Sequence, residues 1–240
     1  MTDWVLKSLG RGIRTTSWPA RAEEAAGVTP GRPVPAARDK TGTNIGVCPT
    51  GALEQEERGV AVDFERCVHC QRCRGEGGMP WQDDFEWADF PGRSRGALPA
   101  AFHRSVNVRY LDAGACGGCM GEARLIDAPP YNLHRFGIFI TATPRDADVL
   151  LVAGPVTEAM RTPLRLTYDA MPEPKRVVAM GVCAINGGVF GQSYACAGGA
   201  GEVIPVDVVI PGCPPPPLAI IHGLLLALGR VEPASLESTP

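Results

Sequence analysis

The sequence predicts an α/β protein, in which residues 105–240 form a doubly wound parallel sheet and residues 1–104 form a smaller, irregular unit. Two observations predict this. The second part contains five short runs rich in β-branched residues, separated by segments with helical spacing, a pattern typical of parallel strands covered by helices. The first part is polar, rich in Pro and Gly, and weakly periodic. We expect the boundary near "DFPGRSRGALPA", where Gly, Pro and charge cluster.

The elements of the second part follow from these runs. A helix is predicted at 158–171, because its apolar residues recur at helical spacing. The apolar run at 218–229 follows four consecutive prolines and contains His222, so we expect a buried core helix that is too short to span a membrane. The predicted strands are residues 105–113, 136–143, 147–154, 175–181 and 206–212.

The bulk composition excludes several classes of protein. The chain has 240 residues, a formal net charge of −3 and 45% apolar residues, a globular composition without the basic balance of a nucleic-acid-binding protein. The N-terminus has no apolar region typical of a secretory signal, so we expect a cytoplasmic protein. Its nine cysteines then indicate metal binding rather than disulfides.

Three cysteines, Cys67, Cys70 and Cys73, are separated by two residues each, the spacing that wraps three corners of a [4Fe–4S] cube in bacterial ferredoxins. Four residues after the third, where such a motif has its last cysteine, the chain has Gly77. An upstream Cys-Pro at Cys48 matches the ligand that crosses to the other cluster in two-cluster ferredoxins. The sequence therefore predicts one surviving cluster, bound by Cys48, Cys67, Cys70 and Cys73.

The same four cysteines have a second interpretation. C-x2-C pairs also suit a structural zinc ion, although the third cysteine and the Cys-Pro favour iron–sulfur. We expect His69, inside the loop, to be solvated. Arg66, Arg72 and Arg74 either raise the cluster potential or form a solvated face, and both interpretations stay open. The predicted ferredoxin-like, single-cluster unit covers about residues 30–80.

The remaining cysteines follow predicted strands. Cys116 and Cys119 form a C-x2-C pair after the first strand, and Cys183 and Cys213 follow two later ones. Because the carboxyl ends of parallel strands meet at one crevice, these four can converge on a second cluster, and neighbouring glycines permit close approach. Cys196 has no partner in this scheme, so we expect a packed free thiol.

Glu122, three residues after Cys119, has two open interpretations. Beside a low-dielectric metal centre its carboxylate would have a raised pKa and would relay protons. Alternatively, it is a carboxylate at a helix N-terminus, stabilised by the helix dipole. His134 and Arg135 are expected to serve packing or subunit contact.

Four segments carry a resemblance to a known family: "GGCMGEA", "RFGIFITATPRDADVLLVAGPVTEAMRTPL", "PKRVVAMGVCAINGGVF" and "VDVVIPGCPPPPLAIIHGLLLALG". They resemble the small subunit of membrane-bound, complex I-related [NiFe] hydrogenases, and equally the B (20 kDa) subunit family of NADH-quinone oxidoreductase, over about residues 105–230. This resemblance implies a flavodoxin-like fold and one [4Fe–4S] cluster next to a large catalytic subunit. Its implied ligands are Cys116, Cys119, Cys183 and Cys213.

Two details refine the resemblance. Quinone-reducing subunits have two adjacent cysteines at the first position, whereas C-x2-C followed by Glu122 resembles the hydrogenase branch, such as the small subunit of formate hydrogenlyase. The N-terminal "LKSLGRGIRTTSWPARAEEAAG" is similar to the start of the ferredoxin-type subunit of the same complexes. The chain thus resembles a fusion of two electron-carrying subunits, with one cluster missing from the ferredoxin part.

The leading hypothesis is an electron-transfer subunit of a group 4-type [NiFe] hydrogenase, with two [4Fe–4S] clusters and no residue that makes or breaks bonds. The expected partners are a large catalytic subunit, membrane subunits of the same complex, and an electron donor or acceptor near the N-terminal cluster. The expected location is the cytoplasmic face of the inner membrane. Two alternatives stay open: a quinone-reducing relative whose large subunit lacks nickel, and a zinc-stabilised module without redox function.

Overall fold

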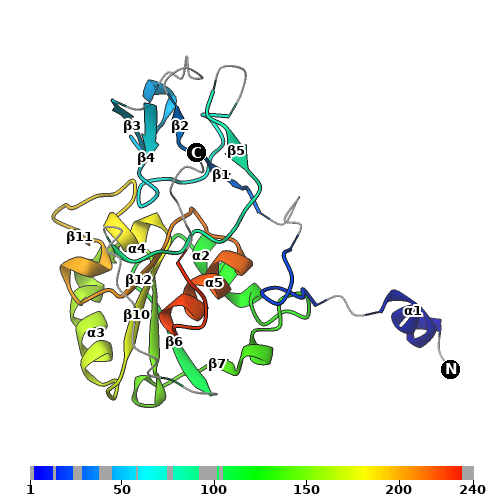
Figure 1. Cartoon of the computed structure of the whole chain (residues 1–240). Coiled ribbons are helices and arrows are strands. Elements are labelled where there is room, and N and C mark those ends of the chain that lie inside the picture. The colour runs from blue at the N-terminus through cyan, green and yellow to red at the C-terminus, as the bar shows by residue number, and fades with distance from the viewer. Residues whose placement is uncertain are drawn as a thin grey trace.

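The computed structural model of the chain describes residues 3–12, 15–23, 29–37, 45–57, 59–74, 78–91, 102 and 105–233. A group of short antiparallel strands lies above a larger α/β unit, and helix α1 (Asp3–Arg11) lies apart from both (Figure 1). Within the described ranges, no helix combines the length and apolarity that crossing a membrane requires. Most of the predicted boundary segment, residues 92–100, lies outside these ranges.

The α/β unit is built on a five-stranded, all-parallel sheet. All five predicted strands are confirmed, each shorter than its apolar run in the sequence. Numbered along the chain, the strands lie in the spatial order 2-1-3-4-5, so the third strand is central, and the second and fifth are at the edges. From one edge to the other they are β12 (Val208–Ile210), β10 (Arg176–Met180), β8 (Val149–Ala153), β6 (Val106–Asp112) and β7 (Ile138–Ile140).

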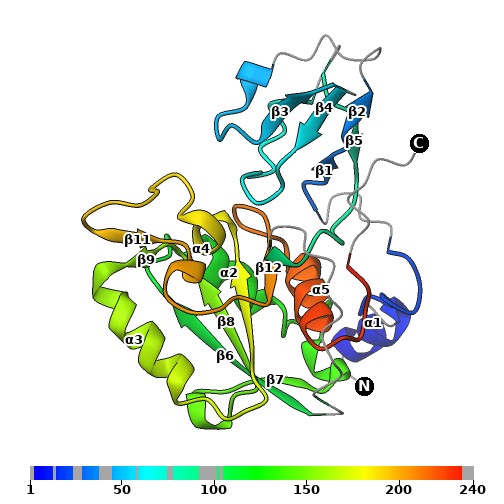
Figure 2. The same cartoon turned by 60° about the vertical axis from the view of Figure 1, so that its left-hand side comes forward.

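Helices cover both faces of this sheet, because successive side chains of a strand point to opposite faces. Leu150 packs in an apolar cluster with Leu164 of the predicted helix, which is confirmed, whereas the next residue, Leu151, packs in the cluster that contains Ile220. The two longest of these helices lie on opposite sides of the sheet (Figure 2). The helices are α2 (Gly118–Leu125) and α5 (Pro217–Ala227) on one face, and α3 (Glu158–Asp169) and α4 (Val182–Asn186) on the other.

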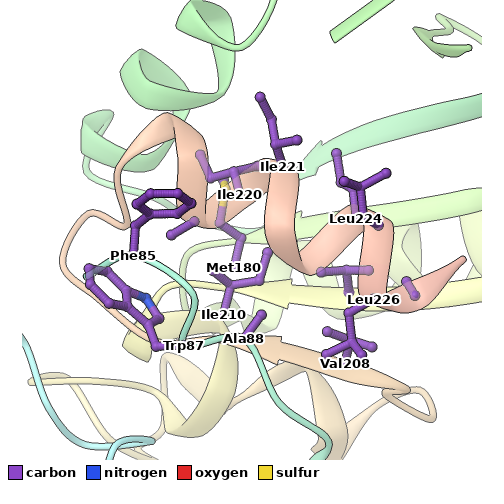
Figure 3. Packing of buried hydrophobic residues seen from close by; sticks show 14 of the residues in the cluster. Phe85, Trp87, Ala88, Met180, Val208, Ile210, Ile220, Ile221, Leu224 and Leu226 are labelled. Atoms are coloured by element: carbon purple, nitrogen blue, oxygen red, sulfur yellow. The ribbon is translucent and has the colours of Figure 1, made fainter. Parts of the chain in front are cut away.

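Helix α5 is the predicted core helix, and every one of its residues is buried. A helix that is apolar on all sides is stable only when it is enclosed. One side of α5 contacts β10 and β12 so closely that a Cβ at Gly223 would lie 2.4 Å from the Ile210 side chain. Phe85, Trp87 and Ala88, from the N-terminal part of the chain, lie beside this helix and β12 (Figure 3).

The N-terminal part consists of short antiparallel strands. Three of them form one sheet in the order β2-β4-β3, and the other two pair with each other. The strands are β1 (Arg32–Pro33), β2 (Ala36–Ala37), β3 (Leu53–Glu56), β4 (Gly59–Val62) and β5 (Trp81–Gln82). The remaining short elements are β9 (Val156–Thr157), β11 (Cys196–Gly198), and the 3-10 helices η2 (Ile45–Val47), η4 (Leu133–Phe136), η5 (Pro144–Asp146) and η6 (Ala200–Glu202).

One apolar core joins the two parts. Trp18 is 2% exposed, and its ring packs edge-on against Phe85 at 5.3 Å. Asp89 forms an antiparallel bridge with Val209 of β12, with N–H···O distances of 3.0 and 2.8 Å in the two directions. The weakly periodic sequence before residue 105 therefore contributes side chains to the core of the α/β unit. The predicted boundary at 104/105 stays a prediction.

Candidate metal centres

Four cysteines of the N-terminal part line one small cavity, as the sequence predicts. Cys48 follows η2, and the other three belong to the loop after β4. Pro33, Leu53, Val68 and Trp81 supply much of the remaining wall, which makes the lining mainly apolar. The four sulfur-bearing residues of the cavity are Cys48, Cys67, Cys70 and Cys73.

The surroundings of Cys48 favour its thiolate. The backbone N–H of Ala52 donates to the Cys48 Sγ at 3.2 Å, and the Thr50 Oγ1 lies 3.5 Å from the same sulfur. Burial acts to raise the pKa of this thiol, but hydrogen bonds from Thr50, Ala52 and Leu53 together lower it. A thiolate is the form that ligates a metal, so this loop is prepared for ligation before any metal arrives.

The thiols of the loop oppose one another's ionisation. The pKa of Cys67 is raised to about 12, mainly by burial and then by the charges of Cys73, Cys48 and Cys70. Like charges at one site destabilise each other's ionised form, and a cation between them reverses the effect. The cavity is therefore suited to an iron–sulfur group with thiolate ligands, and its donor set fits that chemistry.

The loop between these cysteines contains two strained residues, His69 and Gln71, with φ of 54° and 62°. The expectation that His69 is solvated was wrong: it is 5% exposed, and its Nδ1 lies 2.8 Å from the carbonyl oxygen of Gly31. The ring packs against Trp87, which the sequence could not indicate. Nearby Arg72 and Arg74 are exposed, as is Arg66. Gly77 lies outside the described residues.

The second cysteine set is assembled by the sheet. Cys116 lies in the loop between β6 and α2, and Cys119 lies in the first turn of α2. Cys183 lies in α4 after β10, and Cys213 follows β12. Burial raises the pKa of Cys119 to about 12, and the charges of Cys183, Cys213, Cys116 and Asp112 add to this rise. The charges of Cys213 and Cys116 likewise act on Cys183, so all four thiols are within electrostatic reach of one another.

Two glycines make room for the sulfurs at this site. Gly181, two residues before Cys183, has φ of 84°, and a Cβ there would lie 2.9 Å from the Cys119 Sγ. Gly188, which the sequence did not indicate, has φ of 57°, and its Cβ would lie 2.7 Å from the Cys183 Sγ. Both positions combine a left-handed backbone with a close sulfur, so only glycine fits them without a shift.

Asp112, which was not predicted as a site residue, fixes the loop before Cys116. Its Oδ1 accepts hydrogen bonds from the backbone N–H groups of Gly114, at 2.8 Å, and Ala115, at 2.6 Å. A carboxylate that accepts two N–H bonds at the end of a strand fixes the turn that follows. A signal was available, because Asp is a frequent turn-forming residue at such a position.

Glu122 lies beyond the first turn of α2, so the helix-dipole interpretation has no support in the structure. Partial burial raises the pKa of its carboxyl group. The side chain lines an open groove between the two parts of the chain, which Tyr131, His69 and Cys213 also line. Glu122 is thus beside the second cysteine set. Burial raises the pKa of the Tyr131 phenol, and the charge of Glu122 raises it further.

The other candidate residues take part in packing and hydrogen bonds outside the two cysteine sites. Cys196 is buried, as expected of a packed thiol, although it lies in strand β11 and not in a loop. His134 is exposed and stacks on Phe139 at 5.1 Å, and Arg135 donates to the carbonyl oxygens of Thr16 and Trp18. No three His, Cys, Asp or Glu side chains of the described ranges converge closely enough to surround a single metal ion.

Comparison with known proteins identifies the family. The family described as "NADH ubiquinone oxidoreductase, 20 Kd subunit" matches residues 116–227, which include all four cysteines of the second set. Formate hydrogenlyase subunit 7 of Escherichia coli is 39% identical over 61% of this chain and 60% of its own length. This chain therefore spans less than two thirds of that relative.

Two further proteins are similar to this chain. A Pyrococcus furiosus protein named "probable membrane-bound hydrogenase subunit" is 43% identical over 53% of this chain and 77% of its own. A chain of the archaeal membrane-bound sulfane sulfur reductase matches in structure with a TM-score of 0.46 and 34% identity, covering 53% of this chain and 71% of that one. The chain therefore belongs to the 20 kDa subunit family of NADH-ubiquinone oxidoreductase and is related to subunits of formate hydrogenlyase and membrane-bound hydrogenase.

Proposed function

We propose that this chain is the electron-transfer subunit of a group 4-type [NiFe] hydrogenase complex. It would carry single electrons between a redox partner near the N-terminal cysteine set and the metal site of a large subunit near the other. Two [4Fe–4S] clusters would be bound, one by Cys48, Cys67, Cys70 and Cys73, the other by Cys116, Cys119, Cys183 and Cys213. As a member of its family, the chain is a subunit of an oxidoreductase complex related to hydrogenase and NADH-quinone oxidoreductase.

The observation that carries the proposal is that two separate sets of four thiols are each gathered in one place. The N-terminal set lines one cavity, and the C-terminal set lies at three strand ends with mutual electrostatic effects. Four thiolates are the ligand set of a [4Fe–4S] cluster, which supplies reversible one-electron chemistry when bound. The strand order 2-1-3-4-5 also supports the flavodoxin-like description, in which ligands bind at the carboxyl ends of strands.

The residues around the thiols would tune and protect these centres. N–H groups directed at a sulfur, such as that of Ala52 at Cys48, stabilise its negative charge and raise the reduction potential. The apolar wall of the N-terminal cavity limits access of water. We assign Glu122 a role in taking up or releasing a proton beside the second site, on the basis of its raised pKa and its place in the groove.

The partner at the second site would be a large subunit that holds nickel. Cys116 and Cys213 are exposed, so a bound cluster would be close to the protein surface there and accessible to a second polypeptide. The hydrogenase reading is supported by the C-x2-C spacing before Glu122 and by the names of the two relatives at 39% and 43% identity. Through that complex the chain would be peripheral to the cytoplasmic face of a membrane.

The test is metal analysis of the native complex, purified without oxygen through a tag on this chain. We expect nickel together with about eight irons attributable to this chain, since each thiolate-bound cubane contributes four. The same iron without nickel would favour the quinone-reducing relative instead. Zinc in place of iron would contradict both readings and favour a structural module.

A further inference from the structure

A buried aromatic pair lies between the two cysteine sites. His69 is in the loop that carries Cys67 and Cys70, and its ring centroid is 4.2 Å from that of Trp87. Trp87 is fully buried, and its Nε1–H donates to the carbonyl oxygen of Pro211 at 2.8 Å. Pro211 precedes Cys213 by two residues. A chain of direct contacts therefore leads from one cysteine set to the other.

The pair is held rigidly at both ends. The Nδ1 of His69 is hydrogen-bonded to the Gly31 carbonyl oxygen, and the left-handed backbone at His69 is maintained by this packing. At the other end, the backbone next to Trp87 is fixed, because the Ala88 N–H donates to the His222 Nδ1 at 3.3 Å. The bridge between Asp89 and Val209 fixes the segment again one residue further on.

A second approach between the sites is open to solvent. Val68 and His69 line a groove that Cys213 and Pro214 line from the other side, and this groove is open on one side. Contact across it would pass through water. The aromatic pair, in contrast, is almost completely enclosed: His69, which borders the groove, is 5% exposed, and Trp87 is 0% exposed. Protein interiors are close-packed, so the path through the aromatic pair has contacting atoms along its whole length, whereas the path across the groove does not.

We propose that His69 and Trp87 form the route by which electrons cross between the two cysteine sites. The inference rests on the proposed function, because it needs a redox centre at each end. One electron moves to the second centre from the centre held by Cys48, Cys67, Cys70 and Cys73. The first centre is thereby oxidised by one electron and the second is reduced by one electron. No bond is formed or broken and no proton is required.

The experiment uses the full chain with both clusters bound, and it compares Trp87→Leu and Trp87→Phe with the wild type. The matched control is Trp81→Phe. Trp81 also lies beside the first cysteine set and donates its Nε1–H to a backbone carbonyl oxygen, that of Pro30 at 2.9 Å, but it belongs to β5, away from the second set. A photoexcited deazaflavin injects one electron, and freeze-quenched EPR spectra follow the signals of the two clusters over time.

We expect Trp87→Leu to lose the rapid phase of exchange between the clusters while both cluster signals and their midpoint potentials persist. Trp81→Phe should exchange at the wild-type rate. If Trp87→Leu fails to assemble both clusters, Trp87→Phe decides, because it keeps an aromatic core residue but loses the hydrogen bond to Pro211. A wild-type rate in the Trp87 variant that holds both clusters would overturn the route, as would equal slowing in the Trp81 control.

The wild-type protein separates this inference from the function on which it rests. About eight irons with two EPR signals support the proposed function, whatever the Trp87 variants do. About four irons and one signal would contradict the two-cluster function and the route together.

Discussion

The two cysteine sites of this chain are built in opposite ways. The N-terminal site takes three ligands from one seven-residue loop and a fourth, Cys48, from the other side of the β3–β4 hairpin, and they line a largely apolar cavity. The C-terminal site takes its ligands from three strand ends spread over nearly one hundred residues, and two of its cysteines are exposed, against one, Cys70, in the first site. The first site is a property of local sequence, whereas the second exists only when the sheet has formed.

The strongest way to break this comparison is to remove one ligand from each site. Because each set is separate, Cys116→Ala should abolish the C-terminal cluster signal and leave the N-terminal one, and Cys70→Ala should do the reverse. EPR spectra and iron content of the anaerobically purified chain measure both. Cys196→Ala, which removes a buried thiol from neither set, is the control and should retain all the iron. Loss of both signals in either ligand variant would contradict the independence of the sites.

A smaller change tests whether the C-terminal site depends on the close approach of the Gly181 backbone to the Cys119 sulfur. Gly181→Ala would put a Cβ 2.9 Å from the Cys119 Sγ at a φ of 84°. We expect about 2–5 kcal/mol of destabilisation from strain and overpacking together, with loss of the C-terminal cluster.

Gly117→Ala is the matched control for that change. Gly117 is beside Cys116 and has a φ of 95°, but nothing lies within 4 Å of its added Cβ. Strain alone should then cost about 1–2 kcal/mol, and the cluster should stay bound. Denaturant unfolding and iron analysis of both variants measure the difference, and equal losses would show that the sulfur contact is irrelevant.

The stability of the core shared by the two regions should depend on pH through His222, which packs against Trp18. Burial lowers the pKa of this histidine from 6.5 to about 4. The unfolded chain therefore binds the proton more tightly, so the free energy of unfolding is level above pH 6.5 and falls as the pH drops towards 4. Between pH 7 and 5 the loss should be about 2 kcal/mol.

His222→Asn should remove this part of the pH dependence, and it can be compared with His134→Asn, which changes an exposed histidine. Unfolding curves at the two pH values give the slopes. Equal slopes in the wild type and His222→Asn would mean that other groups cause the acid sensitivity.

The smallest expected effect concerns only the N-terminal site. Thr50→Val removes the hydroxyl that lies 3.5 Å from the Cys48 Sγ. A hydrogen bond to sulfur stabilises the reduced, more negative cluster, so the midpoint potential of this centre should fall. A net hydrogen bond of about 1 kcal/mol corresponds to about 40 mV for one electron. Redox titration should find the C-terminal centre unchanged, and a shift in both centres would contradict the assignment.

Much of the α/β unit and of both thiol sets is predictable from the sequence, for two physical reasons. Buried parallel strands are continuous apolar runs, so β8 and β10 are predictable from the sequence. The thiol positions were recognisable either by spacing, as at Cys67 and Cys70, or because parallel strands end at one edge, as at Cys183.

The contacts between the two parts of the chain correspond to no pattern in the sequence. Trp18 and Trp87 are single aromatic residues in irregular segments. No periodic pattern in the sequence indicates that they pack into the core of the α/β unit. His69 was misjudged for the same reason, because its burial depends on Trp87, which is remote in the sequence. Long-range packing of isolated side chains is a tertiary property that spacing rules do not contain.

The segment around Asp89 has a consequence for how this chain could be divided. Residues 85–90 complete the surface of α5 and pair with the edge strand β12, and Trp18 fills the same region from further upstream. Proteolytic cleavage, or gene fission between residues 91 and 105, would leave a C-terminal fragment. In that fragment the apolar helix α5 and the edge of strand β12 would be exposed to solvent. Separation into two polypeptides would therefore be viable only if the pieces stayed in constant association.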